Sequence, residues 1–340
     1  MQPFIYRRPQ TALAAVEEAS RISSRGPATV STAGQFIAGG TNMSDYMKLN
    51  VVRPELVIDI NHLPPSEYGR IESSDAGLRI GCLVRMSEAE DHQDIRARYP
   101  VIFEALKLAA SRQIRNMASL GGNVLQRTRC EYFREVSWPC NKRNPGSGCS
   151  AIGGANRAHA VLGTSEQCIA TYPGDFAQAL IALGAAVETL GPSGRRTIPF
   201  ADLHREPGGQ PHIETVLEPG ELIAFYDVPA GPWTRRSRYV KVRDRDSYQF
   251  ALASAAVALD LDGDTVRTAR IALGGVASVP WRAYESEEAL TGKPLTEENA
   301  ARAAEIAFKN AVTQQHNAFK VPLGKQTVVR ALLEAKAMRV

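Results

Sequence analysis

The sequence lacks the long apolar run of a membrane-spanning protein and the one-sided charge that is usual in nucleic-acid-binding proteins. Its 340 residues contain no stretch close to the roughly 18 consecutive apolar residues of a membrane helix. Lysine and arginine number 40 and aspartate and glutamate 36, so the net charge is only +4, and the basic residues form no run or basic–aromatic patch. The composition therefore argues against both classes of protein.

The N-terminal region lacks the apolar core and the cleavage site of a signal peptide. Residues 1–24 instead predict a short strand followed by an amphipathic helix rich in Ala and Glu. We therefore expect no signal peptide of the chain's own, and export would need the signal of a partner.

Cysteine is scarce, but four of the five cysteines fall in one short window. Cys130, Cys140, Cys149 and Cys168 lie in a segment with many turn formers and no sustained apolar period, which cannot bury a core of its own. Four thiolates around an iron–sulfur cluster would order this segment. A zinc site, two disulfides or merely buried thiols are alternatives, although the short cysteine pairs typical of structural zinc are missing. Cys82, on a predicted strand, is expected to be a small buried side chain.

Strand and helix patterns alternate along the rest of the chain, and the pattern changes near residue 235. Strands are predicted at 56–60, 78–83, 186–190, 195–199, 239–243 and 250–260, with a further strand that ends at residue 273. Helices are predicted up to residue 48, at 101–111 and 176–183, and in two Ala-rich segments near the C-terminus. A Pro/Gly-rich stretch at 207–220 predicts a long surface connection.

Two double-glycine segments, Gly39-Gly40 and Gly121-Gly122, each carry a hydroxyl residue and an Asn within two residues. Paired glycines let successive backbone N–H groups converge on an anion such as a diphosphate. Each pair taken alone is more often a tight turn. Neither has the spacing of the Rossmann fingerprint or of the phosphate-binding P-loop, so nucleotide binding by those two mechanisms is disfavoured.

Several short motifs occur in a characteristic order. They read Phe-Ile-Ala-Gly-Gly-Thr-Asn at 36–42, Ile-Arg-Asn at 114–116, Ser-Leu-Gly-Gly-Asn at 119–123, Tyr-Pro-Gly-Asp at 172–175, Leu-Glu-Pro-Gly-Glu-Leu at 217–222, Tyr-Val-Lys-Val-Arg at 239–243 and Leu-Gly-Gly-Val at 273–276. This order resembles the FAD subunits of the xanthine dehydrogenase and carbon monoxide dehydrogenase family, which are subunits of molybdenum hydroxylases, over nearly the whole chain.

The resemblance implies an α+β fold. An FAD-binding domain of the vanillyl-alcohol-oxidase and CO-dehydrogenase flavoprotein type, made of two α/β subdomains, would precede a smaller C-terminal α+β domain with a three-stranded sheet and helices. The expected limits are 1–60 for the first FAD-binding subdomain, 61–235 for the second, with an iron–sulfur insert at 125–168, and 236–340 for the CO-dehydrogenase-flavoprotein-like C-terminal domain.

The resemblance also implies a set of FAD-binding residues, with the first loop around the diphosphate and the last two residues of the set close to the flavin. The set is Phe36, Ile37, Ala38, Gly39, Gly40, Thr41, Asn42, Met43, Ser119, Gly122, Asn123, Asp175 and Lys241. Other roles are open: Asp175, with Gln178 three residues on, could cap the following helix, and Lys241 could be an ordinary exposed strand lysine. Asn42 stands where many members of the family carry an acid, so a carboxylate contact there would become an amide contact here.

The cysteine segment resembles the insert of the FAD subunits of bacterial periplasmic aldehyde oxidoreductases. That likeness implies a 4Fe-4S cluster on Cys130, Cys140, Cys149 and Cys168. His159 could replace one cysteine, although a lone histidine in a polar loop is more often hydrogen-bonded or exposed. Basic side chains crowd the segment and would either offset the charge of a cluster or form a solvated or partner-docking surface. They are Arg127, Arg129, Arg134, Lys142, Arg143 and Arg157.

The implied function is that of the FAD and 4Fe-4S electron-transfer subunit of a heterotrimeric, molybdenum-dependent aldehyde oxidoreductase. A large subunit with the molybdenum cofactor would oxidise the aldehyde, a small 2Fe-2S subunit would pass electrons to FAD, and FAD would reduce an external acceptor. No catalytic residue beyond the flavin is expected in this chain. The family also implies a periplasmic location by co-export with a partner subunit, or otherwise a cytoplasmic one.

Three alternatives to this function remain. The chain could be the flavin and 4Fe-4S subunit of an enzyme like 4-hydroxybenzoyl-CoA reductase, or a self-contained flavin oxidase. It could also be a zinc-stapled interaction module without catalytic function, in which the glycine loops are only turns.

Overall fold

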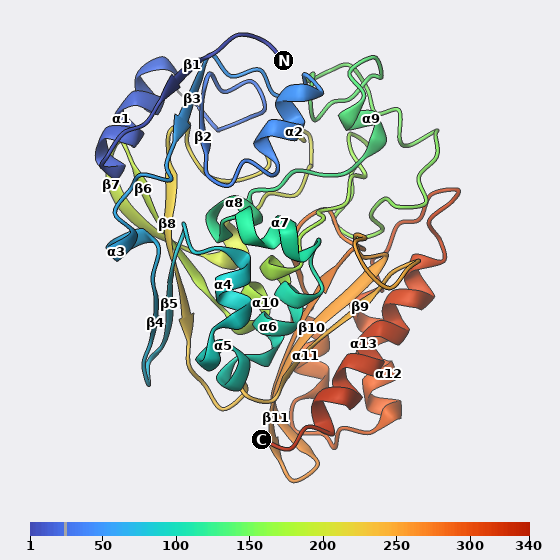
Figure 1. The fold of residues 1–340 in the computed structure, drawn as a ribbon. Helices are drawn as coiled ribbons and strands as arrows, with labels where there is room; N and C mark the ends of the chain where they lie inside the picture. Colours follow the sequence, from blue (N-terminus) through green and yellow to red (C-terminus); the bar gives the residue numbers. More distant parts are fainter. Residues whose placement is uncertain (24–25) are drawn as a thin grey trace.

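The computed structural model describes residues 1–23 and 26–340 and contains three β-sheets. The chain runs from an N-terminal unit at the top of Figure 1, through a central group of helices, to a C-terminal unit at the lower right. One large apolar core joins the first two sheets and the central helices, and a second core fills the C-terminal unit. Within the described residues, no helix is long and apolar enough to cross a membrane.

The N-terminal unit is a small parallel sheet with the strand order β1–β3–β2, and helix α1 packs against it. Its elements are β1 (Ile5–Arg7), α1 (Ala12–Ile22), β2 (Gly34–Ile37), α2 (Met43–Lys48) and β3 (Leu56–Asp59). One face of α1 is apolar, and its residues Ala15, Val16 and Ala19 are fully buried. These elements confirm the predicted strand and helix pattern; residue 24, the predicted end of the first helix, lies outside the described residues.

The second sheet is antiparallel, with the strand order β4–β5–β8–β6–β7. Its strands are β4 (Ile71–Ser73), β5 (Gly77–Gly81), β6 (Ala186–Gly191), β7 (Gly194–Pro199) and β8 (Leu222–Pro229). The predicted hairpin of β6 and β7 is confirmed. The sequence pattern does not predict the central strand β8, because this strand is buried on both faces and so lacks the alternation of a half-exposed strand.

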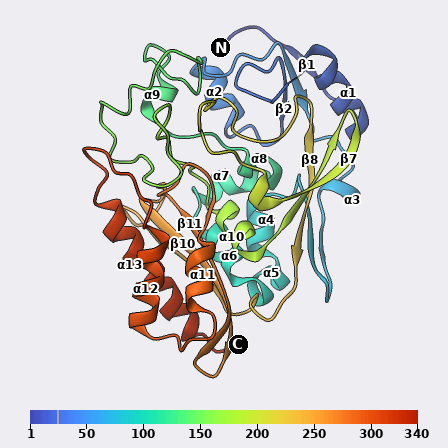
Figure 2. The same ribbon diagram turned by 180° about the vertical axis from the view of Figure 1, so that it is seen from behind.

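A group of short helices fills the space between the second sheet and the C-terminal unit (Figures 1 and 2). They are α4 (Met86–Asp91), α5 (Gln93–Arg98), α6 (Pro100–Lys107), α7 (Arg112–Met117), α8 (Leu120–Val124), α10 (Phe176–Leu183) and the 3₁₀ helix η1 (Phe200–Asp202), whereas the short helix α3 (Pro65–Tyr68) lies beside β5 at the left of Figure 1. Helix α10 has its predicted limits, every one of its residues is buried, and it ends at Gly184 with a φ of 69°. It contacts both β8 and the C-terminal sheet, so it ties the two large units together.

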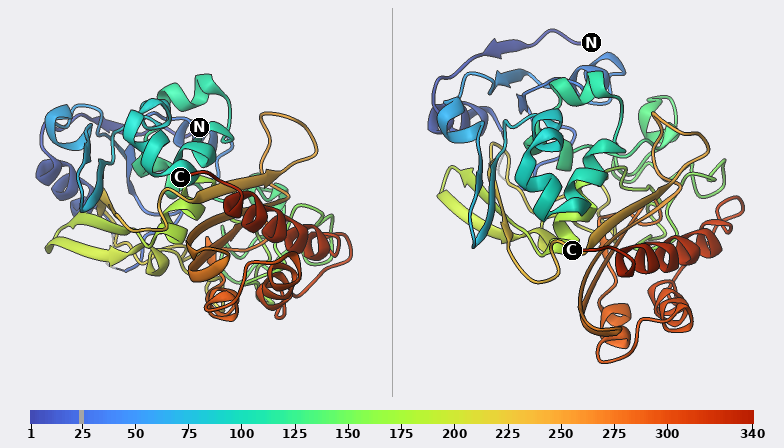
Figure 3. Two further views of the ribbon diagram at one scale, coloured as in Figure 1. Left: turned by 90° about the horizontal axis from the view of Figure 1, so that it is seen from below. Right: turned by 60° about the horizontal axis from the view of Figure 1, so that its bottom comes forward.

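The C-terminal unit is an antiparallel sheet with the order β12–β11–β10–β9. Its elements are β9 (Ser237–Val242), β10 (Ala253–Asp262), β11 (Thr265–Gly274), β12 (Trp281–Arg282), α11 (Tyr284–Leu290), α12 (Glu297–Ala307) and α13 (Lys320–Lys336). Helices α11 to α13 lie along one side of this sheet, as Figure 3 shows from below, and α6 and α10 pack from the other unit. The three predicted strands and both Ala-rich helices are present. The two-residue strand β12 and the Glu-rich helix α11 are additional.

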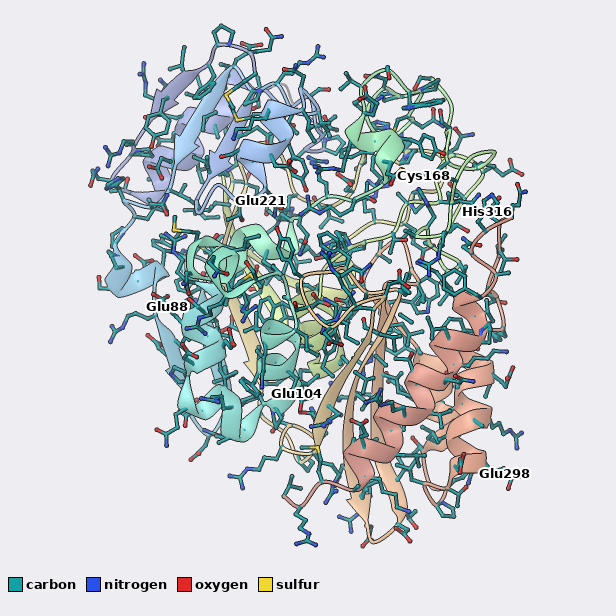
Figure 4. The ribbon with its side chains drawn as sticks, turned by 45° about the vertical axis from the view of Figure 1, so that its right-hand side comes forward. Glu88, Glu104, Cys168, Glu221, Glu298 and His316 are labelled. Atoms are coloured by element: carbon teal, nitrogen blue, oxygen red, sulfur yellow. The ribbon has the colours of Figure 1, made fainter. Side chains whose placement is uncertain are left out.

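Residues 125–168 form the loop-rich insert, whose only helix among the described residues is α9 (Glu131–Arg134). The insert lies beside the N-terminal unit and above the C-terminal helices (Figure 1). Buried polar bonds fasten it to the C-terminal unit: Lys320 Nζ donates to Ala158 O at 2.9 Å and to Gly275 O at 2.6 Å, and Asn317 Nδ2 donates to Ala160 O at 3.0 Å. Figure 4 labels His316 at this junction. The prediction was that cysteine sulfurs would order this segment; in the structure, contacts with neighbouring units also order it, including an apolar cluster that Phe133 and Cys140 share with Tyr46.

Replacing Lys320 by Met should remove a pH dependence of stability. The Lys320 side chain is fully buried, and burial, together with the charge of Arg157, lowers the pKa of Lys320 from its ordinary value of 10.5 to about 7. Between those pH values the unfolded chain keeps a proton that the folded chain has released, so the stability of the wild-type protein should rise with pH. The melting temperature of the wild type minus that of Lys320→Met should therefore increase between about pH 7 and about pH 9.5.

Lys325→Met is the matched control, because Lys325 lies on the same helix in a more exposed ion pair with Glu305. Its melting temperature should follow that of the wild type at every pH. A difference between wild type and Lys320→Met that stays flat with pH would contradict a lowered pKa at Lys320.

Candidate functional site

A cavity of about 1130 Å³ opens between the N-terminal unit, the second sheet and the insert. This volume is at or above the roughly 300–1,000 Å³ that is usual for small-molecule sites, so it admits a ligand as long as a dinucleotide. Its walls come from both glycine loops, the start of the insert, the loop before α10 and the connection that leads into β8. Figure 4 labels Glu221, which belongs to that last wall.

The two glycine loops meet at one edge of this cavity. A Cβ on Gly39 would lie 1.8 Å from the carbonyl oxygen of Met117, just before the second loop, and only glycine allows so close an approach. Gly40 has a φ of 70°, a left-handed conformation that also favours glycine. A Cβ on Gly121 would lie 2.8 Å from Cys82 Cβ. Glycine at these positions therefore lets the backbones of the two loops and their neighbours pack closely at the edge of the cavity.

Asn61 and Arg85 hold the two loops together. Asn61 Nδ2 donates to Ala38 O at 2.9 Å, and Arg85 donates from Nη2 to Asn61 Oδ1 at 2.7 Å and from Nη1 to Met117 O at 2.7 Å. The sequence analysis missed both residues, because neither lies in a glycine motif. The one local signal is that Asn61 is a polar residue two positions after the fully buried strand β3.

All of the predicted FAD-binding residues except Lys241 line the cavity. Ser119 caps α8, since its Oγ accepts from Gly122 N at 3.3 Å, and its hydroxyl hydrogen remains available to a ligand. Asn123 Oδ1 is buried and has no hydrogen-bond partner among the described residues. An unpaired buried acceptor is costly, so this atom fits a site where a ligand donates to it.

Asp175 and Lys241 form a buried ion pair at 2.8 Å next to the cavity. Asp175 Oδ1 also accepts from Tyr239 Oη at 2.6 Å, and Lys241 Nζ also donates to Leu108 O at 3.0 Å. The capping role considered for Asp175 is wrong, because its side chain makes no bond to the start of α10. The exposed position considered for Lys241 is also wrong, since its side chain is 1% exposed. Asp175 lines the cavity and Lys241 lies behind it, so contact of Lys241 with a flavin stays a prediction.

The four clustered cysteines line a second, small cavity of about 10 Å³ within the insert. Figure 4 labels Cys168 there. All five cysteines are free, so the disulfide alternative is wrong, and Cys82 is 1% exposed, as expected. Among the described residues no three His, Cys, Asp or Glu side chains converge as a single metal ion would require, which disfavours the zinc alternative.

His159 is 5% exposed and its Nε2 lies 3.1 Å from Cys130 Sγ, so it is hydrogen-bonded and not solvent-facing. Burial, aided by the charge of Lys320, lowers the pKa of His159 to about 4, so the ring is neutral. Burial raises the pKa of the Cys130 thiol to about 12 and also raises that of Cys168. These thiols would release their protons only when they bind a metal.

The basic residues of the insert are mostly paired and half-buried, so the view of them as a solvated basic loop is wrong. Arg134 Nη1 lies 2.6 Å from Asp45 Oδ2, and Lys142 Nζ lies 3.1 Å from Glu214 Oε1. Arg143, which is 6% exposed, donates to backbone carbonyls of the insert. Burial lowers the pKa of Lys142, and the neighbouring cysteines partly oppose this shift.

Comparison with known proteins agrees with this geometry. The family described as the FAD binding domain in molybdopterin dehydrogenase matches residues 5–231, and the CO dehydrogenase flavoprotein C-terminal domain matches residues 238–335. The chain is 44% identical over 339 residues to the aldehyde oxidoreductase FAD-binding subunit PaoB of Escherichia coli, covering 99% of each chain. It is also similar to a crystallised chain of carbon monoxide dehydrogenase from Hydrogenophaga pseudoflava, with 28% identity, a TM-score of 0.74 and 99% coverage of both chains. A chain of the enzyme from Oligotropha carboxidovorans has the same fold, with a TM-score of 0.76, 23% identity and 99% coverage of both chains.

The fold and the cavity define an FAD-binding flavoprotein. The family matches make the assignment more specific: this chain belongs to the FAD-binding medium subunits of the molybdenum hydroxylase family. The family and the fold class inferred from the sequence motifs are thereby confirmed. The residue-by-residue FAD contacts and the domain limits at 60 and 235 stay predictions.

Gly39→Ala should weaken FAD binding strongly. The added Cβ overlaps Met117 O, and relieving that overlap must push the two loops apart. Overpacking of this kind costs about 1–3 kcal/mol, so the affinity for FAD should fall about tenfold or more. Flavin fluorescence titration measures this. Gly153→Ala is the control, because its Cβ would meet nothing within 4 Å; equal affinities for both variants would contradict the close packing of the loops.

Lys241→Met should destabilise the fold by about 3–5 kcal/mol, because it leaves the Asp175 carboxylate buried without its cation. Chemical denaturation of the flavin-free protein measures this. Arg157→Gln breaks an ion pair with Asp244 in which the two side chains are 55% and 44% exposed, so it should change the free energy of unfolding far less than Lys241→Met. The double variant Asp175→Asn/Lys241→Met should regain part of the loss; if it does not, the two side chains are not coupled.

Proposed function

We propose that the chain is the FAD and 4Fe-4S electron-transfer subunit of a molybdenum-dependent aldehyde oxidoreductase. The observation that carries this proposal is the full-length, 44% identity to a relative whose name specifies an aldehyde oxidoreductase. FAD supplies the redox chemistry when it is bound. The chain itself orients the cofactor with the two glycine loops and meets it with the polar groups of Ser119, Asn123 and Asp175.

The positions of the four clustered cysteines support the 4Fe-4S part of the proposal. Cys130, Cys140, Cys149 and Cys168 surround one cavity in a segment that has no core of its own, and four thiolates are the usual ligands of such a cluster. Ala170 N donates to Cys168 Sγ at 3.4 Å, the kind of hydrogen bond that stabilises a bound thiolate. The cavity of about 10 Å³ holds about one water, so the cysteine side chains must turn outward to admit a cluster.

The partners in this proposal are a large subunit with the molybdenum cofactor and a small 2Fe-2S subunit, which together with this chain form a heterotrimer. Electrons would enter from the 2Fe-2S subunit and leave to an external acceptor. We also propose a periplasmic location, reached by co-export on a partner's signal; cell fractionation with and without that signal tests it. A chain that stays in the cytoplasm with the partner's signal intact would refute this location.

Anaerobic analysis of the complex tests the cofactors. The wild-type complex should contain one FAD and about four irons in this chain beyond those of the 2Fe-2S subunit, and an aldehyde should bleach the flavin absorbance. Cys140→Ser should lose the irons of this chain and keep FAD, because Cys140 lines the cysteine cavity and not the flavin cavity. Gly153→Ala, at an insert position that lines neither cavity and has open space for a Cβ, should keep both.

The outcomes separate the parts of the proposal. FAD without the additional iron would remove the 4Fe-4S assignment and leave the flavin assignment in place. Flavin that aldehydes do not bleach, and that 4-hydroxybenzoyl-CoA reoxidises after chemical reduction, would indicate a 4-hydroxybenzoyl-CoA-reductase-like enzyme. Aldehyde oxidation by this chain without its partners would indicate a self-contained flavin oxidase.

A further inference from the structure

Arg129, at the start of the insert, lies on the wall of the flavin cavity and contacts two other parts of the chain. Its Nη2 donates to Asn42 Oδ1 at 2.6 Å, in the first glycine loop. Its guanidinium carbon lies 5.7 Å from the ring centre of Tyr46 in α2 and 5.1 Å from that of Phe250 in the loop before β10. Two segments that are far apart in the sequence, residues 42–46 and the loop before β10, therefore hold this one guanidinium in place.

The positive charge of Arg129 is only partly balanced. Asn42, its hydrogen-bond partner, is a neutral amide. The nearest carboxylate, Asp45, makes its two short bonds with Arg134, at 2.6 and 3.0 Å, whereas Arg129 Nη1 stands 3.7 Å away. Hydrogen bonding to Arg134 is the largest cause of the lowered pKa of Asp45, and the charge of Arg129 contributes less.

Arg129 also has donor capacity left over. Its Nε is buried and has no hydrogen-bond partner among the described residues. A guanidinium carries five N–H groups in a planar fork that matches the oxygens of a phosphate. A cation with unused donors, fixed against a glycine loop whose backbone is open to the cavity, is suited to an anionic group of the bound ligand.

We propose that Arg129 binds the diphosphate of FAD, so that the insert supplies a cationic ligand to the flavin site. The proposal rests on FAD binding by the chain and does not depend on whether the insert holds a cluster. The side chain lies beside Gly40, Thr41 and Asn42, the part of the cavity wall that is suited to a diphosphate. Asn42 orients the guanidinium without neutralising it, which a carboxylate at this position would do.

This arrangement links the order of the insert to flavin affinity. The insert reaches the first glycine loop and the following helix α2 at three places: Arg129 on Asn42, Arg134 on Asp45, and the backbone N–H of Arg127, which donates to Tyr46 Oη at 2.9 Å. The first of these involves a side chain whose buried Nε has no partner among the described residues. A variant of Arg129 should therefore affect phosphate recognition beyond any effect on folding.

The test is flavin titration of the full chain in its complex after reversible removal of FAD. Arg129→Gln should lower the affinity for FAD about tenfold or more, which is the usual effect of losing a charge-assisted hydrogen bond to phosphate. It should leave the affinity for riboflavin, which has no phosphate, unchanged. Arg129→Lys keeps the charge and should recover part of the FAD affinity, and FAD binding to Arg129→Gln should depend less on salt concentration than binding to the wild type.

Arg157→Gln is the matched control, because this insert arginine is exposed and does not line the cavity. It should bind FAD and riboflavin as the wild type does, and the melting temperatures of the variants report on folding. An equal loss of affinity for FAD and riboflavin in Arg129→Gln would assign Arg129 to the folding of the insert and overturn the proposal. Unchanged FAD affinity with unchanged salt dependence would overturn it as well.

Discussion

The flavin cavity depends on one close backbone contact, in which the carbonyl oxygen of Met117 occupies the place where any residue but glycine would carry its Cβ at position 39. This contact brings together two loops that are nearly eighty residues apart in the sequence, one after β2 and one before α8. Asn61 and Arg85 then join the same two backbones by hydrogen bonds. Because the loops meet through backbone, residues of both loops line the same cavity.

The insert, unlike the glycine loops, is held mainly by side chains. It has almost no regular structure, and its order comes from contacts with neighbouring parts of the chain. Lys320 and Asn317 bind its backbone from the C-terminal unit, Arg129 reaches the first glycine loop and Arg134 reaches α2. Phe133 and Cys140 also belong to an apolar cluster that includes residues of the N-terminal unit. The insert is therefore part of the flavin subunit's framework and not an appendage.

The flavin cavity and the cysteine cavity share a wall, since Lys142 and Ala170 line both. The ammonium of Lys142 lies between them and is held by Glu214 and by the carbonyl of Pro211. A buried, paired cation at this place stabilises negative charge on either side of the wall. Acidic partners such as Glu214 balance basic residues of this loop, so the net charge of the chain is small although many basic residues lie close together.

Sequence patterns are enough to predict many of the local elements and the family. Helix α10 and the strands β6 and β7 follow from apolar spacing and turn formers, and the order of the glycine motifs indicates the family, because these signals lie within a few consecutive residues. Which distant groups meet depends on the tertiary structure. Lys241 is buried against Asp175, although strand alternation suggested that Lys241 is exposed and a capping pattern suggested that Asp175 caps a helix. Asn61, Arg85 and Arg129 also reach the glycine loops only in the folded chain. Burial and long-range pairing are properties of the packed chain. A strand that is buried on both faces, such as β8, or a single arginine in a loop has no local sequence pattern from which its position could be predicted.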